Sequence, residues 1–223
     1  MADGNVMNRV KSIIESDKDR KYIVVSAPGK RYSGDIKITD VLYECHKEVA
    51  QKGVCGAAFQ LIRNRFTSIV KELGIDFDIQ PVLDETEKRI NSENDEDFTA
   101  SRGEYLSARV MAEGLGAKFI DAEDVIFFDK NGAYDAERSD KAINEALRGV
   151  EKAVFPGFYG RGADGKVKTF SRGGSDISGA IVARALGASV YENWTDVSGF
   201  LACDPRIVDS PRRIKALSYK ELR

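Results

Sequence analysis

The chain has 223 residues, of which 42% are apolar and 9% aromatic, and its 34 basic side chains nearly balance 36 acidic ones, giving a net charge of −2. This composition is typical of a soluble globular protein with one good core, and the balanced charge gives no overall field that would attract nucleic acid or an anionic membrane. No apolar run approaches the roughly 20 residues of a membrane span, and residues 1–12 contain no signal-peptide core, so we expect a cytoplasmic protein.

The cysteines and the histidine give no sign of a metal centre. Cys45, Cys55 and Cys203 have no metal-site spacing, and His46 is the only histidine. A zinc site needs a cluster of such ligands. We therefore expect no protein-bound metal, and His46 is interpreted as an ordinary residue on the surface of a helix.

Strand and helix patterns alternate in the first half of the chain. The β-branched run "KYIVVSA" predicts a strand that stops at Pro28–Gly29. Amphipathic spacing then predicts helices over 38–53 and 58–74, the second ending on Gly74. The polar stretch 85–97 is interpreted as a surface helix and loop.

The alternation continues in the second half. A helix is expected over 104–117, followed by one or two short strands and a turn at Asn131–Gly132. The remaining predictions are a helix over 138–152, a buried strand with a glycine-rich exit over 153–162, a helix over 175–186 and a strand over 188–195. Such alternation indicates a mainly parallel sheet covered on both faces by helices.

In folds of this kind, ligands bind beyond the carboxyl ends of the strands, in the loops that lead into helices. Four stretches are predicted to occupy such positions: 24–40, 99–104, 155–176 and 193–206. Each stretch also has a structural explanation. Ser101 and Glu104 match a capping box, Ser175 or Asp176 can cap the helix that follows, and "DPR" is a common turn that leaves Arg206 as a surface cation.

Taken together, the four stretches favour a site for a polyphosphate and an anionic substrate. A helix N-terminus flanked by Gly173 and Gly174 presents backbone N–H groups to an anion. Arg172 adds a fork of donors that suits a carboxylate or phosphate, whereas Asp176 suits an ammonium group or a metal ion. This pairing is the one expected for an amino acid substrate.

The motifs "VVSAPGK…T", "SRGE", "PGFYG", "SRGGSD" and "WTDVSGF…DPR" occur in the order found in the aspartate kinases, and the chain resembles their catalytic domain over essentially its whole length. The resemblance implies one domain over 1–223 with a three-layer αβα sandwich around a mostly parallel sheet. It also implies transfer of the γ-phosphate of ATP, with Mg²⁺, to the side-chain carboxylate of L-aspartate. The product, 4-phospho-L-aspartate, enters lysine, threonine and methionine biosynthesis.

The resemblance also implies roles for individual residues. Arg172, Asp176 and Glu104 would form the catalytic set, and Gly173 and Gly174 would lie against the nucleotide. The other implied contacts are Ser26, Thr39, Phe158 and Ser175 on the aspartate side, together with Glu104 and Arg172, and Thr195, Asp196 and Arg206 on the nucleotide side. Leu201 stands where many members have a tyrosine against the nucleotide, so that contact is not expected here.

The two ends depart from the family pattern. The family's first strand and its lysine–glycine loop are expected to be absent before Met1, and a second phosphate-binding lysine segment and the ACT regulatory domains would follow "YKELR". Removing one preorganised donor typically lowers turnover by about 10²–10³, so we expect a poor kinase.

Two other interpretations stay open. One is a non-catalytic ligand-binding or scaffold homologue that keeps the fold and lacks the phosphate-binding lysines. The other is a kinase for a different substrate, such as glutamate or UMP, which the pairing of "SRGGSD" with "WTDV" disfavours. Association into a homo-oligomer is also left open.

Overall fold

The computed structural model describes residues 1–171, 173–195, 199–218 and 220. The chain divides into two compact units, residues 1–191 and 192–223, and each is described by itself. The prediction of one domain over the whole chain therefore stays a prediction. No helix among the described residues is long and apolar enough to cross a membrane.

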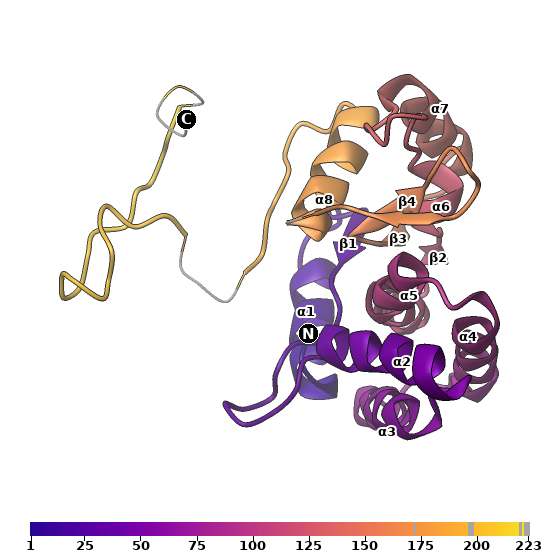
Figure 1. Ribbon diagram of the computed structural model, residues 1–223. Helices are drawn as coiled ribbons and strands as arrows, with labels where there is room; N and C mark the ends of the chain where they lie inside the picture. The colour runs from indigo at the N-terminus through magenta and orange to yellow at the C-terminus, as the bar shows by residue number, and fades with distance from the viewer. Residues whose placement is uncertain (172, 196–198, 219, 221–223) are drawn as a thin grey trace. The chain divides into compact units, whose positions relative to one another are not determined.

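The first unit enters the fold with a helix and is mainly helical up to residue 115 (Figure 1). Asp3 caps the first helix by accepting a hydrogen bond from the Val6 backbone at 2.9 Å. The elements are α1 (Gly4–Glu15), β1 (Tyr22–Val25), α2 (Ile38–Lys52), α3 (Gly56–Leu73), α4 (Gln80–Glu93) and α5 (Glu96–Leu115).

The rest of the first unit supplies most of the strands. Its elements are β2 (Lys118–Phe119), α6 (Ala122–Val125), α7 (Ala136–Ala146), β3 (Ala153–Pro156), β4 (Tyr159–Arg161), β5 (Val167–Thr169) and α8 (Gly174–Ala185). The helices predicted over 38–53, 58–74 and 175–186 are confirmed, and Gly74 ends α3 with a φ of 64°. Glycine tolerates this left-handed conformation, which ordinary residues avoid.

Three parallel strands form the sheet in the order β1-β3-β2, and β4 and β5 form a separate antiparallel hairpin. Helix α5 packs on one face of the sheet, where α1–α4 surround it, and α8 packs on the other face together with α7 (Figure 1). All four residues of β3 are buried because this central strand is covered on both faces. The predicted α/β sandwich with a parallel sheet is therefore confirmed.

Two sequence predictions about helix starts are wrong. The capping box at Ser101 and Glu104 does not exist, because α5 already begins at Glu96, where Asp95 accepts a hydrogen bond from the Phe98 backbone at 2.9 Å. The stretch 99–104 is consequently the inside of a helix rather than a loop. Neither Ser175 nor Asp176 caps α8, since the helix begins one residue earlier, after Gly173.

The strand predicted over 188–195 is also wrong, because these described residues have no regular structure. β-propensity is realised only where a neighbouring strand offers a partner. Here the chain instead leaves α8 with Tyr191 placed against that helix, its hydroxyl donating to the Asp176 carbonyl at 3.2 Å. In the second unit, the described residues pair only through the isolated bridge between Leu201 and Arg213.

Candidate active site

The carboxyl ends of β1 and β3 lie side by side and carry the first two site segments. Val25 pairs with Pro156 in the parallel register, and the Gly157 backbone donates to the Val25 carbonyl at 2.9 Å. Ser26, which follows β1, is exposed at this edge of the sheet. The register therefore brings Ser26 and the "PGFYG" segment to one place, as expected for a ligand site beyond parallel strands.

Two glycines allow the end of β3 to touch the start of α8. A Cβ atom on Gly157 would lie 2.7 Å from Cα and Oγ of Ser175, and one on Gly174 would lie 2.6 Å from Cδ2 of Phe158. No real Cβ tolerates such contacts, so these two close approaches require glycine. The Phe158 backbone also donates to Ser178 Oγ at 3.1 Å. Phe158 and Ser175 are thus held close together, and their predicted contacts with aspartate stay predictions.

Helix α5 reaches the same edge through Gly103 and Glu104. A Cβ on Gly103 would lie 2.7 Å from the Ala27 Cβ, so α5 packs directly on the segment after β1. Glu104 is 6% exposed and accepts a hydrogen bond from the Ala27 backbone N–H. Its second oxygen, Oε2, is buried without a hydrogen-bond partner.

Burial dominates the electrostatics of Glu104. Loss of hydration raises the pKa of this carboxyl to about 7, although the Ala27 N–H and the charge of Arg102 both favour the ionised form. An unpartnered buried carboxylate oxygen is costly unless a ligand completes it. The arrangement suits a ligand ammonium group, which would donate to Oε2 and balance the charge.

The loop from Ser26 to Thr39 is held by an ionic network that the sequence reasoning missed. The buried carboxylate of Asp35 lies 2.8 Å from Arg31 Nε and 2.7 Å from Arg65 Nη2. Arg65 also donates to the carbonyl of Gly29, in the same loop, at 3.1 Å. Thr39 is half-buried in the first turn of α2. The Ile38 backbone donates to the Pro28 carbonyl at 3.2 Å, which joins the two sides of the predicted aspartate-binding loop, and the network holds the segment between them. In the sequence, Asp35 and the two arginines look like ordinary surface charges. Only the fold shows that the Asp35 carboxylate is buried.

The N-terminus of α8 is open towards the site. The N-cap residue is Gly173, which has a φ of 59° and no side chain with which to cap the helix. An uncapped helix start offers backbone N–H groups and the positive end of the helix dipole to an anion. Asp176 lies in the first turn and is exposed, and it is not enclosed with Glu104 in the buried part of the site.

The other predicted residues lie outside the described residues or in the second unit. Arg172 and Asp196 lie outside the described residues. Thr195 and Arg206 belong to the second unit, where Arg206 Nη2 pairs with Asp204 Oδ2 at 2.6 Å, and the roles predicted for these four residues stay predictions.

The described residues contain no group of three or more His, Cys, Asp or Glu side chains that could hold a metal ion. Magnesium ions in nucleotide sites usually bind through one or two carboxylates and the substrate phosphates. The use of Mg²⁺ therefore stays a prediction, and no step below depends on it.

A comparison with known protein families agrees with this geometry. The model of the amino acid kinase family matches residues 1–223. The chain therefore belongs to the amino acid kinase family.

Within this family, the individual proteins that the chain resembles are aspartokinases. The chain is 33% identical to aspartokinase 3 of Bacillus subtilis, and the match covers 100% of this chain and 52% of the relative. The crystal structure of aspartate kinase from Clostridium acetobutylicum matches with 52% identity and a TM-score of 0.94, covering 99% of this chain and 51% of that one. Aspartokinase III of Escherichia coli, solved in complex with aspartate and ADP, matches with 26% identity and a TM-score of 0.79, over 96% of this chain and 51% of that one.

These matches confirm the resemblance to the aspartokinase catalytic domain that the motifs indicated. The chain spans about half the length of the relatives it matches.

Proposed function

We propose that this chain belongs to an aspartate kinase and binds L-aspartate and ATP where β1, β3, α5 and α8 meet. The reaction would transfer the γ-phosphate of ATP to the side-chain carboxylate of aspartate, as the first step towards lysine, threonine and methionine. The observation that carries the proposal is Glu104, a buried carboxylate with one unpartnered oxygen beside Ala27. A substrate ammonium is the group that completes it.

Each functional group of the substrate has a different proposed partner on the protein. Glu104 binds the ammonium group, the hydroxyls of Ser26, Thr39 and Ser175 donate to the carboxylates, and Phe158 covers the carbon chain. Arg172 supplies the guanidinium for one carboxylate. An acidic side chain near a diacid is useful only if it faces the amine, because facing a carboxylate would repel the substrate.

The chemical step needs no general base. The side-chain carboxylate of aspartate has an ordinary pKa near ~3.9, so it is already ionised at neutral pH. One of its oxygens attacks the γ-phosphorus, the bond from that phosphorus to the β,γ-bridging oxygen breaks, and ADP leaves with the electron pair. The barrier is electrostatic, and positioning and charge neutralisation supply most of the catalysis. The open N-terminus of α8 contributes N–H groups to this neutralisation.

Calorimetric titration with L-aspartate tests the proposal independently of turnover. The unmodified chain is expected to bind aspartate and to reject N-acetyl-L-aspartate, which lacks the ammonium. Glu104→Gln should bind aspartate about 10–100-fold more weakly, because it loses a charge-assisted contact. Glu113→Gln is the matched control, since Glu113 is an exposed residue of the same helix.

Failure of the unmodified chain to bind aspartate, or equal binding by Glu104→Gln, would contradict the proposed site. Arg172→Ala should weaken aspartate binding much more than nucleotide binding, and equal losses would count against its assignment. Measuring ADP release then separates a kinase from a ligand-binding homologue: binding of both ligands with no aspartate-dependent ADP would favour the homologue.

A further inference from the structure

A second cleft, outside the candidate active site, lies between helices α4 and α5. It has a volume of about 250 Å³, and its walls include Phe98 and Tyr105 from α5 and Val82, Glu85 and Arg89 from α4. Arg102 of α5 also lines it. The two helices follow each other in the chain, joined at Asn94 and Asp95, and side chains from both line the cleft.

Arg102 is a buried cation without a carboxylate partner. Its side chain is among the largest fully buried ones, at 1% exposure. Nε and Nη2 donate to Ser101 Oγ at 3.0 and 2.9 Å, and Nε also donates to the Phe98 carbonyl at 3.3 Å. Among the described residues, no carboxylate forms an ion pair with Arg102 and no acceptor is hydrogen-bonded to Nη1. Nη1 is not among the buried polar atoms that lack a partner, so it is accessible to a ligand in the cleft.

Aromatic rings compensate part of this charge. The guanidinium carbon of Arg102 lies 4.2 Å from the centre of the Phe98 ring and 4.5 Å from that of Tyr105. Arg89 lies over the same Phe98 ring at 4.3 Å. A cation–π contact is weaker than the hydration that a buried guanidinium loses. Arg89 is neutralised by Glu93, whose Oε1 lies 2.7 Å from Arg89 Nε. Arg102 is therefore the cation of the cleft that has no carboxylate at ion-pair distance among the described residues, and the charge of Glu123 acts on it only at longer range.

The cleft is separate from the site around Glu104. Side chains two residues apart on an α-helix point in directions that differ by about 200° around the helix axis. Arg102 consequently faces α4, whereas Glu104 faces the Ala27 segment on the other side of α5. A ligand at Arg102 would not occupy the predicted aspartate site.

We propose that the α4–α5 cleft binds a small organic anion that carries one carboxylate on a flat apolar group. The carboxylate would accept from Nη1 of Arg102, and the apolar part would lie against Phe98, Tyr105 and Val82. The cleft, of about 250 Å³, is slightly smaller than the ~300–1,000 Å³ of most drug-sized sites, which favours a small ligand. Glu85, at the rim, disfavours multiply charged anions such as phosphate.

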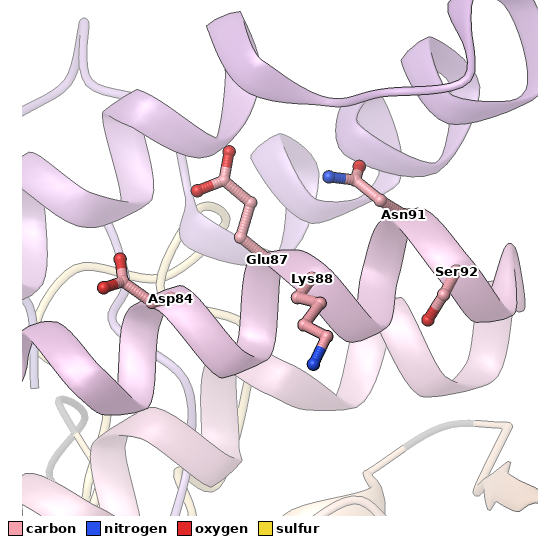
Figure 2. Close-up of a pocket in the computed structure, with 5 residues that line it drawn as sticks. All are labelled: Asp84, Glu87, Lys88, Asn91 and Ser92. Carbon is pink, nitrogen blue, oxygen red and sulfur yellow. The ribbon is translucent and has the colours of Figure 1, made fainter.

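A larger hollow of about 480 Å³ on α4 provides a contrast. Figure 2 shows its lining residues along this one helix. Its polar groups are already engaged, since Arg63 pairs with Asp84 and Glu87 at 2.8 Å each, and Asn91 accepts from the Cys55 backbone at 3.0 Å. The polar groups of that hollow already have protein partners, whereas Nη1 of Arg102 has no hydrogen-bond acceptor among the described residues.

Binding of benzoate, monitored by calorimetry and by protein NMR shifts, tests the proposal. Benzyl alcohol serves as the uncharged probe and inorganic phosphate as the multiply charged one. The chain is expected to bind benzoate saturably, and Arg102→Met should weaken this binding about 10–100-fold, because a hydrogen bond to a charged group is lost. Arg63→Met is the control, since Arg63 also lies over a phenylalanine ring but has carboxylate partners.

Two exposed or half-buried positions keep the test decisive if Arg102→Met fails to fold. Glu85→Gln should tighten benzoate binding about two- to fivefold by removing an exposed like charge. Val82→Trp should fill the cleft and abolish binding. The proposal is overturned if benzoate does not bind saturably, if benzyl alcohol binds equally well, or if neither Glu85→Gln nor Val82→Trp changes the affinity.

Discussion

Glu104→Gln makes the electrostatics of the candidate active site measurable through protein stability. The ordinary pKa of a glutamate carboxyl is 4.5, and burial raises that of Glu104 to about 7 in the folded chain. The folded state therefore holds its proton more tightly than the unfolded state. Below about pH 4.5 the carboxyl is neutral in both states, and ionisation costs no stability.

As the pH rises from about 4.5 to about 7, the unfolded chain loses the Glu104 proton while the folded chain keeps it, so stability falls. Above about 7 the carboxyl is ionised in both states and the full cost is present. The difference between a pKa of 4.5 and one of about 7 corresponds to about 3 kcal/mol. The side chain is 6% exposed, so solvent screening does not reduce this figure much.

Glutamine keeps the size of the side chain and can accept the Ala27 hydrogen bond, but it does not titrate. Any effect of its unpartnered amide is the same at every pH. The free energy of unfolding of Glu104→Gln minus that of the unmodified chain should therefore rise by about 2–3 kcal/mol between about pH 5 and pH 8.5. Urea unfolding at both pH values measures it, and other titrating groups cancel in the difference. A difference that stays constant within about 0.5 kcal/mol would refute the claim that Glu104 is buried and unpaired.

Three further outcomes follow from the same site. At about pH 6.5, aspartate binding should release protons, because a substrate ammonium lowers the pKa of Glu104. The binding enthalpies measured in buffers of different ionisation enthalpy should then differ. Identical enthalpies would contradict the contact between Glu104 and the ammonium. Gly157→Ala should lower the free energy of unfolding by about 1–3 kcal/mol, because its Cβ meets the α8 backbone, whereas Gly56→Ala, with nothing within 4 Å, should leave it nearly unchanged. Asp35→Asn should speed amide exchange in the loop 27–37. Because hydrogen bonds from Arg31 hold the pKa of Asp35 below its usual range, the stabilisation by this carboxylate should be present above about pH 4 and disappear as the pH falls further.

Helices α2, α3 and α8 were predictable because they depend on short-range pattern. Amphipathic spacing identified α2 and α3, and Gly74 marked the end of α3. The start of α5 was not predictable in the same way. Ser101 and Glu104 satisfy the capping pattern, yet Asp95 caps the helix six residues earlier. The local sequence alone does not show which of the two possible caps is used.

The alternation of local strand and helix patterns along the chain was enough to indicate the α/β class and the parallel sheet, since each pattern is encoded over a few neighbouring residues. Burial was not encoded in this way. The contact of Gly103 with Ala27 makes Glu104 a buried group with a raised pKa, and the packing of α4 on α5 leaves Arg102 without a carboxylate. The chemical character of a charged side chain depends on which distant segments exclude water from it, and only the tertiary structure determines those neighbours.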